Sequence, residues 1–215
     1  MSHRLHQLDH QELAQRAREI RLLLLDVDGV LTDGRIILND QGVESKHFSV
    51  RDGSGISFWR QTGRQVGILS GRSAPVVDRR ANELGISPVV QGASDKRAAF
   101  IQILQQLGLQ KHQICFMGDD LADLPVLSAG VGLAACPVDA APEVLTQANL
   151  VTTARGGHGA VRELIETLLK AVGEWEPMVS ALLGHPQKSA AFPIHPEAQI
   201  GERAQSLVTP QGLGK

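Results

Sequence analysis

The stretch at residues 22–33, LLLLDVDGVLTD, limits most strongly what this chain can fold into. Four consecutive leucines at 22–25 are typical of a strand buried on both faces, as in a parallel sheet. Two carboxylates, Asp26 and Asp28, follow directly, and Gly29 supplies a turn. Residues two apart in an extended chain point to the same side, roughly 6–7 Å apart. The sequence therefore predicts paired acids at the carboxyl end of a parallel strand, where α/β proteins bind ligands.

An acidic pair of this kind has two other interpretations. An EF-hand calcium loop needs an oxygen ligand at its fifth position, Gly at its sixth and Glu at its twelfth. Counted from Asp26, those positions hold Val30, Leu31 and Ile37, which excludes such a loop. A strand-to-turn junction that is rich in Asp but carries no chemistry stays open from this motif alone.

Three further segments follow in a fixed order. Ser70 comes after the apolar run 66–69, Lys96 begins an apparent helix, and the acidic segment 118–123 follows the apolar run 114–117. Each segment taken singly also has a structural interpretation, such as a helix cap. Together they supply a nucleophilic carboxylate, an acid, a hydroxyl and a cation for phosphoryl oxygens, and a further acid for Mg²⁺. The set therefore indicates phosphoryl transfer.

Apolar periodicity predicts an alternation of strands and helices. Strands are expected at residues 22–26, 66–70, 88–91, 114–118, 130–134 and 149–152. Helices are expected at about residues 6–18, 54–62, 74–84, 95–107, 121–128, 141–147 and 158–172. This alternation predicts an α/β fold, a Rossmann-like and mostly parallel sheet with helices on both faces.

One segment, residues 34–50, interrupts the alternation. Its turn-forming residues at 39–42 separate two β-prone arms, which predicts a β-hairpin inserted after the first strand. The stretches between Gly29 and Leu69 and between Gly71 and Asp95 are too short to hold a separate cap domain. The arms carry these apolar residues: Ile36, Ile37, Leu38, Val43, Phe48 and Val50. Isolated hairpins are marginal in water, so we expect this one to pair with copies in other subunits; a flap folded onto its own domain is the alternative.

The ordered motifs resemble the haloacid dehalogenase superfamily of phosphatases, from about residue 20 to residue 172. The segments 50–53 (VRDG), 69–72 (LSGR), 118–126 (GDDLADLPV) and 156–163 (GGHGAVRE) are similar to the family of 3-deoxy-D-manno-octulosonate 8-phosphate phosphatases. Members of that family release phosphate and a free sugar acid of bacterial lipopolysaccharide. Relatives that dephosphorylate nine-carbon sialic-type acids share much of this pattern.

The resemblance implies a role for each acid. Asp26 would attack phosphorus and become an aspartyl phosphate, and Asp28 would act as general acid and then as general base. A Mg²⁺ cofactor would be held by Asp26, the backbone carbonyl of Asp28 and Asp119. Ser70 and Lys96 would hold the phosphoryl oxygens. Two acids are expected to orient metal-bound waters or Lys96 from behind: Asp120 and Asp123.

Substrate contacts are also carried over from the resemblance, with Asp28 and Lys96 among them. Arg72 and Arg80 match basic positions near the phosphate or the substrate carboxylate, where a guanidinium suits a planar anion; a surface helix position is the alternative for Arg80. Ser57 stands where the family often has a basic residue, and Arg60 is a candidate to compensate. One continuous segment aligns with residues that contact the sugar acid: Ser49, Val50, Arg51, Asp52 and Gly53.

Composition agrees with a single-domain enzyme. The chain has 215 residues, of which 42% are hydrophobic, enough for one core. We expect the phosphatase domain at 1–183 and a flexible tail at 184–215, which is rich in Pro, Gly and polar residues.

The net charge of −2 gives no electrostatic footprint for nucleic acid or an anionic membrane. Both cysteines lie in or beside apolar runs, so we expect free thiols in a reducing cytoplasm.

The sequence thus predicts a Mg²⁺-dependent phosphomonoesterase acting on a small sugar acid phosphate, with a nine-carbon substrate as the alternative to the eight-carbon one. A phosphotransferase would need a cap that excludes water, and the chain has no room for it. A non-catalytic assembly subunit is disfavoured because every expected catalytic position is intact. The resemblance further implies a homotetramer in which hairpins of neighbouring subunits help close the sites.

Overall fold

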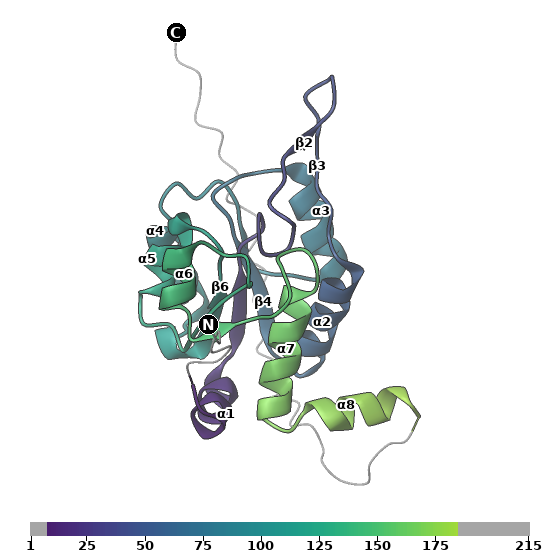
Figure 1. The fold of residues 1–215 in the computed structure, drawn as a ribbon, viewed down its shortest axis with the longest axis vertical. Coiled ribbons are helices and arrows are strands. Elements are labelled where there is room, and N and C mark those ends of the chain that lie inside the picture. Colours follow the sequence, from purple (N-terminus) through teal and green to yellow (C-terminus); the bar gives the residue numbers. More distant parts are fainter. Residues whose placement is uncertain (1–7, 185–215) are drawn as a thin grey trace.

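A computed structural model describes residues 8–184 and shows a parallel six-stranded sheet in the order β5-β4-β1-β6-β7-β8. Helices cover both of its faces (Figure 1). The strands are β1 (Leu22–Leu25), β4 (Gln65–Leu69), β5 (Val89–Val90), β6 (Ile114–Met117), β7 (Leu133–Cys136) and β8 (Leu150–Val151). The predicted fold class is confirmed.

The leucines of β1 form the centre of two apolar layers. Each is fully buried. Leu23 and Leu25 belong to the cluster on one face of the sheet, whereas Leu22 and Leu24 belong to the cluster on the other. Successive side chains of a strand point to opposite faces, so an unbroken run of four leucines supplies both layers at once.

The helices divide between these faces. One face carries α1 (His10–Glu19), α2 (Val50–Gln61), α3 (Pro75–Leu84) and α7 (Ala160–Ala171). The opposite face carries α4 (Lys96–Leu107), α5 (Leu124–Leu127) and α6 (Pro142–Gln147). Two 3₁₀ turns, η1 (Lys111–Gln113) and η2 (Leu121–Asp123), flank β6. Across residues 8–184, none of the helices combines the length and the apolar character needed to cross a bilayer.

The predicted hairpin is present but is shorter than residues 34–50. Its strands β2 (Ile37–Leu38) and β3 (Glu44–Ser45) pair antiparallel, and it projects from the body of the molecule (Figure 1). Its second arm ends before Val50, because Ser49 accepts the backbone N–H of Asp52 and starts α2 at Val50 rather than at residue 54. Val50 is therefore a helix residue, and the prediction that it lies in the hairpin arm is wrong.

Two other boundaries differ from the sequence prediction. The strand expected at 130–134 is β7, which begins only at Leu133, because Gly130 adopts a left-handed conformation and Gly132 packs against the backbone of His112. The sequence did not predict α8 (Trp175–Leu182), whose Trp175 ring packs edge-on against Phe58 with 5.9 Å between centroids. The predicted tail lies outside the described residues apart from residue 184, as do residues 6–7 of the first predicted helix.

Candidate active site

The candidate site lies where the strand order of the sheet reverses. β1 is flanked by β4 and β6, and the chain runs outward in both directions from this point. Doubly wound sheets bind ligands at the carboxyl ends of the strands at such a switch point. A cavity of about 260 Å³ opens there. The predicted site residues that line it are Asp26, Asp28, Ser70, Arg72, Lys96, Asp119, Asp120 and Asp123.

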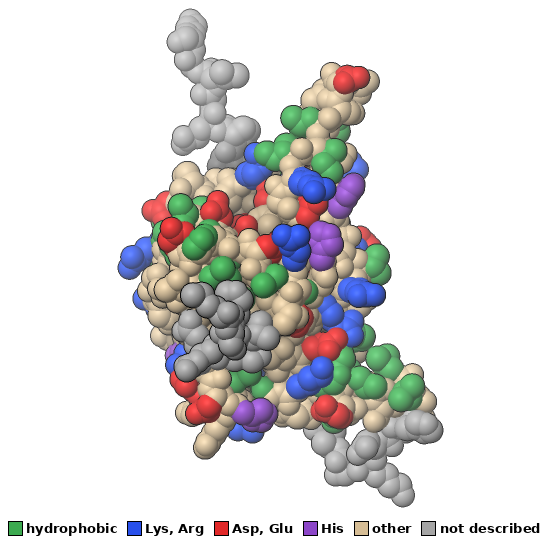
Figure 2. Space-filling model, viewed as in Figure 1, with side chains coloured by type: hydrophobic (Ala, Val, Ile, Leu, Met, Phe, Trp, Pro, Cys, Tyr) green, Lys and Arg blue, Asp and Glu red, His purple; other side chains and the backbone are tan. Residues whose placement is uncertain are grey.

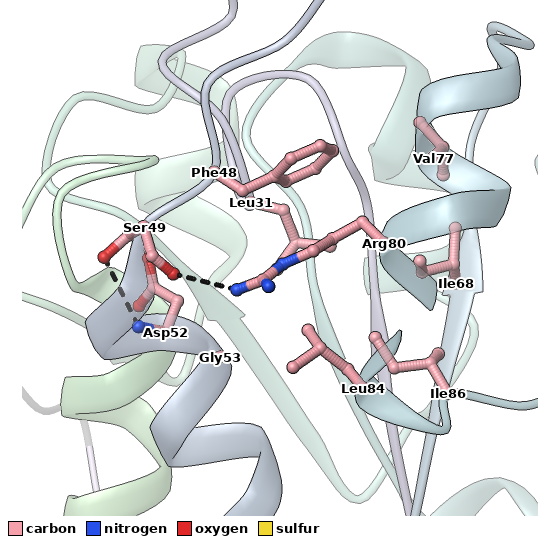
Figure 3. A pocket seen from close by; sticks show the side chains of 10 residues that line it. All are labelled: Leu31, Phe48, Ser49, Asp52, Gly53, Ile68, Val77, Arg80, Leu84 and Ile86. Carbon is pink, nitrogen blue, oxygen red and sulfur yellow. Dashed lines mark hydrogen bonds between the residues drawn. The ribbon is translucent and has the colours of Figure 1, made fainter. Parts of the chain in front are cut away.

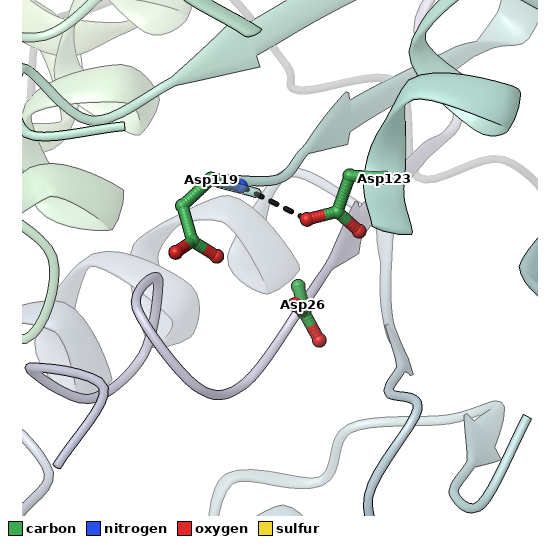
Figure 4. A group of neighbouring side chains, drawn as sticks. All are labelled: Asp26, Asp119 and Asp123. Atoms are coloured by element: carbon green, nitrogen blue, oxygen red, sulfur yellow. Dashed lines mark hydrogen bonds between the residues drawn. The ribbon is translucent and has the colours of Figure 1, made fainter. Parts of the chain in front are cut away.

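Three carboxylates converge at the bottom of this cavity. Asp26 follows β1, Asp119 follows β6, and Asp123 ends η2; one oxygen from each lies within 4.8 Å of the others (Figure 4). Asp119 Oδ1 is buried and has no hydrogen-bond partner among residues 8–184. Clustered carboxylate oxygens are the ligands that Mg²⁺ prefers, so the donor set and the unpartnered oxygen fit this ion.

The acids of this cluster raise one another's pKa. Burial, reinforced by the charges of Asp26, Asp123 and Asp120, raises the pKa of Asp119 from 3.8 to about 8. Burial and the charge of Asp123 raise the pKa of Asp26 from 3.8 to about 6, although Lys96 acts in the opposite direction. Like charges in a poorly solvated site disfavour ionisation. A divalent cation would offset both effects.

Lys96 is the cation that partly compensates the cluster. As the first residue of α4 it is buried, with Nζ 2.9 Å from Asp26 Oδ2 and 2.7 Å from Asp123 Oδ1. Burial by itself would lower the pKa of this ammonium, but the charges of Asp26 and Asp123 outweigh it and raise the pKa. Asp123 also accepts the backbone N–H of Asp119 at 3.0 Å. Asp123 therefore fixes both the ammonium and the backbone of the neighbouring acid.

Close backbone packing allows the acids to meet. Gly29 has a φ of 89°, and a Cβ there would overlap the Asp119 carboxylate. A Cβ at Gly118 would likewise overlap the Asp123 side chain. A side chain at either position would push an acid out of the cluster, which explains why glycine flanks both acidic motifs.

The second acid of the leading motif, Asp28, lies next to charged side chains from the hairpin and from the segment that follows β4. Lys46, which directly follows β3, donates to Asp28 Oδ1 and also lies 2.8 Å from Glu44. Arg72 Nε lies 3.5 Å from Asp28 Oδ2, and its Nη2 lies 3.0 Å from Glu44. Sequence reasoning does not single out Glu44 or Lys46. The available signal is their spacing, because residues two apart place opposite charges on one face of a strand.

Comparison with known proteins agrees with this geometry. A profile of haloacid dehalogenase-like hydrolases matches residues 48–130. The chain is 46% identical, over 165 residues, to 3-deoxy-D-manno-octulosonate 8-phosphate phosphatase KdsC of Yersinia pestis, a match that covers 77% of this chain and 88% of that protein. The chain belongs to the haloacid dehalogenase-like hydrolases. The KdsC of Escherichia coli K12 is 43% identical over 163 residues, covering 76% of this chain and 86% of that one.

Solved structures of haloacid dehalogenase-like hydrolases share the fold. The 3-deoxy-D-manno-octulosonate 8-phosphate phosphatase of Moraxella catarrhalis, solved with a magnesium ion, a phosphate ion and a KDO molecule, superposes with a TM-score of 0.77. It is 38% identical, and the match covers 80% of this chain and 98% of that one. With the curated relatives, these findings make the protein a phosphatase.

The predicted substrate residues of the phosphatase lie in three places. Arg72 lines the acidic cavity, and its side chain is 48% exposed. Ser49, Asp52, Gly53 and Arg80 instead line a second, mostly apolar pocket between α2 and α3 (Figure 3). Three more lie on the exposed surface of α2: Val50, Arg51 and Ser57. Within one chain, the structure does not bring the residues of α2 and α3 to the acidic cavity.

Asp52 has a structural role that the sequence did not predict. It is 1% exposed, and its carboxylate oxygens accept the backbone N–H groups of Gly159 and Arg162 at 3.2 and 2.8 Å. Negative charge stabilises the N-terminus of a helix, so Asp52 fastens α2 to the start of α7. Both oxygens of Asp52 are buried and engaged in this way, and its contact with substrate stays a prediction.

Arg80 is held between α2 and α3. Its guanidinium lies 3.5 Å from the Ser49 carbonyl oxygen and 2.9 Å from Glu83. In the described part of the chain, its buried Nε has no hydrogen-bond partner. Arg80 is therefore not a simple surface residue of α3, which was the alternative interpretation. Its contact with substrate stays a prediction.

Proposed function

We propose that this phosphatase hydrolyses 3-deoxy-D-manno-octulosonate 8-phosphate to the free sugar acid and phosphate, in lipopolysaccharide precursor synthesis. The observation that carries the proposal is the convergence of Asp26, Asp119, Asp123 and Lys96 at the sheet's switch point. Relatives that are 43–46% identical bear the name of this activity. Asp26, the backbone carbonyl of Asp28 and Asp119 are the proposed ligands of Mg²⁺, which would neutralise phosphoryl charge when bound.

In the first half-reaction, Asp26 attacks phosphorus in line, and the bond to the sugar oxygen breaks as an aspartyl phosphate forms. Asp28 gives its proton to the leaving sugar oxygen. Lys96 and Ser70 hold phosphoryl oxygens while charge builds on them. Ser70 is buried at the end of β4 on the cavity wall, which is a suitable place for this contact.

In the second half-reaction, Asp28 takes a proton from water as the water oxygen attacks phosphorus. The bond from Asp26 to phosphorus breaks, which restores the Asp26 carboxylate and releases inorganic phosphate. General acid–base help of this kind is worth on the order of 10²–10⁴ in rate. Arg72 is the proposed contact for a substrate anion, because its half-exposed guanidinium opens into the cavity.

The proposed active form is a homotetramer. Apolar side chains are exposed along the projecting hairpin (Figure 2). Ile36 is 55% exposed, Leu38 61% and Val43 56%. Exposed apolar patches mark association surfaces. These side chains would be buried by contact with other subunits, which supports the proposed assembly. Such assembly is the proposed route by which Arg80 and the start of α2 reach a neighbour's substrate. The cytoplasmic location stays a prediction.

A panel of phosphorylated substrates tests the proposal. We expect kcat/KM to be highest for 3-deoxy-D-manno-octulosonate 8-phosphate and lower by at least tenfold for nine-carbon sialic-type 9-phosphates and simple hexose phosphates. Asp26→Asn serves as the chemical control and should release no phosphate from any of them. A higher kcat/KM for a nine-carbon acid would contradict the substrate assignment while leaving the phosphatase chemistry in place.

A further inference from the structure

A closed ring of four charges joins the hairpin to the site of its own chain. Lys46 contacts both Asp28 and Glu44, and Arg72 contacts the same two acids. The two positive and two negative charges balance. Figure 2 shows charged side chains gathered at the base of the hairpin, whereas hydrophobic ones lie along its length.

Lys46 is placed to act on Asp28 rather than on a substrate. Its side chain is only 1% exposed, and it is absent from the lining of the acidic cavity. Its ammonium is directed at two carboxylates of the same chain. Arg72, by contrast, lines the cavity and is 48% exposed. Of these two cations, Arg72 is therefore the one available to a ligand.

Asp28 has few other groups to fix its carboxyl. Thr32 Oγ1 is 3.5 Å from Oδ1, at the limit of a hydrogen bond. Asp28 Oδ2 is buried and accepts no hydrogen bond from any residue that the structure describes. A group that transfers protons needs a fixed orientation toward the reacting oxygen, and Lys46 supplies a charge-assisted hydrogen bond to Asp28 Oδ1.

Glu44 lets the same lysine serve both half-reactions. Asp28 carries a proton before the sugar leaves and is ionised once the proton has been given away. A buried ammonium without a counter-ion is strongly unfavourable. Because Lys46 lies 2.8 Å from Glu44, it keeps a counter-ion when Asp28 is protonated and gains a second one when Asp28 is ionised.

We propose that Lys46 is a positioning residue for Asp28, carried to the site by the hairpin of the same chain and balanced by Glu44. The hairpin base then sets the geometry of proton transfer, independently of what covers the hairpin's apolar length. This inference rests on the proposed role of Asp28 as general acid and base. It assigns a task to residues outside the phosphatase motifs.

Leaving-group dependence tests the proposal. With enzyme in excess over substrate, release of the leaving group is compared for the sugar acid phosphate, whose alkoxide needs a proton, and for p-nitrophenyl phosphate, whose phenolate does not. For Lys46→Met we expect at least a tenfold loss with the sugar substrate and less than a threefold change with the aryl substrate. Lys46→Arg should recover part of the loss, and Lys111→Met, on the exposed η1 turn, should behave like wild type.

Three outcomes separate the possibilities. If Asp28→Asn shows the same leaving-group selectivity and Lys46→Met matches it in direction, the proposal stands. Equal losses of Lys46→Met on both substrates would overturn it and leave Lys46 as an anchor of the hairpin. If Asp28→Asn itself lacks selectivity, the proposed role of Asp28 fails, and the inference fails with it. Circular dichroism of each variant excludes loss of the fold as the cause.

Discussion

Metal-free protein should lose stability as the pH rises from about 5 to about 8. In the folded chain, burial and neighbouring acids raise the pKa of Asp119 from 3.8 to about 8. Between these pH values the folded state holds a proton on Asp119 that the unfolded state has released. The free energy of unfolding therefore falls as pH rises, because stability decreases wherever the folded state binds more protons.

The size of this loss in the free energy of unfolding follows from the raised pKa of Asp119. At ~1.4 kcal/mol for each tenfold change in an ionisation constant, the interval from pH 5 to pH 8 costs on the order of 3 kcal/mol through Asp119. Asp26, with its pKa raised to about 6, adds to the loss in the same direction. For a chain of this size, such a change lowers the melting temperature by roughly 10 °C.

Urea unfolding followed by tryptophan fluorescence measures this effect, because Trp59 is 1% exposed in the folded state. The comparison is made in EDTA and again in saturating Mg²⁺, which should remove most of the pH dependence by pairing with the ionised acids. Asp119→Asn should flatten the metal-free profile and abolish stabilisation by Mg²⁺. Asp40→Asn, at the exposed hairpin turn, is the matched control and should behave like wild type.

Equal stability of the metal-free protein at pH 5 and pH 8 would refute this reasoning. The same refutation follows if Asp119→Asn retains the wild-type pH profile, because the titrating group would then lie elsewhere.

Three further outcomes are expected. EDTA should abolish phosphate release and Mg²⁺ should restore it, whereas full activity after exhaustive metal removal would contradict the metal site. Asp52→Ala should cost about 1–3 kcal/mol in urea unfolding, because two buried backbone N–H groups at α7 lose their acceptor; an unchanged midpoint would contradict the assigned contact. Light scattering at micromolar concentration should give a mass near four times 23.1 kDa, and a fully active monomer would refute the shared site.

Much of the fold could be predicted because it depends on local pattern. The four leucines of β1 had to be a strand buried on both faces, since successive side chains alternate between faces and all four are apolar. Asp26 and Asp28 follow that strand directly, so their place at the sheet edge needed only the parallel topology. The spacing of the later motifs along an alternating chain predicted that Lys96 and Asp119 would join them.

Tertiary structure decided what depends on contacts between distant segments. The motif at 50–53 predicts a substrate contact for Asp52, and only the structure shows that its carboxylate binds backbone N–H groups more than a hundred positions away at the start of α7. The sequence does not predict the contact of Lys46 with Asp28, because this contact depends on how the hairpin approaches Asp28 in the folded chain. Such pairings follow from how the chain closes on itself, and no local pattern encodes them. The sequence by itself determined the central strand and the acids that follow it, because both depend on local pattern, and only the folded chain decided which charges surround those acids.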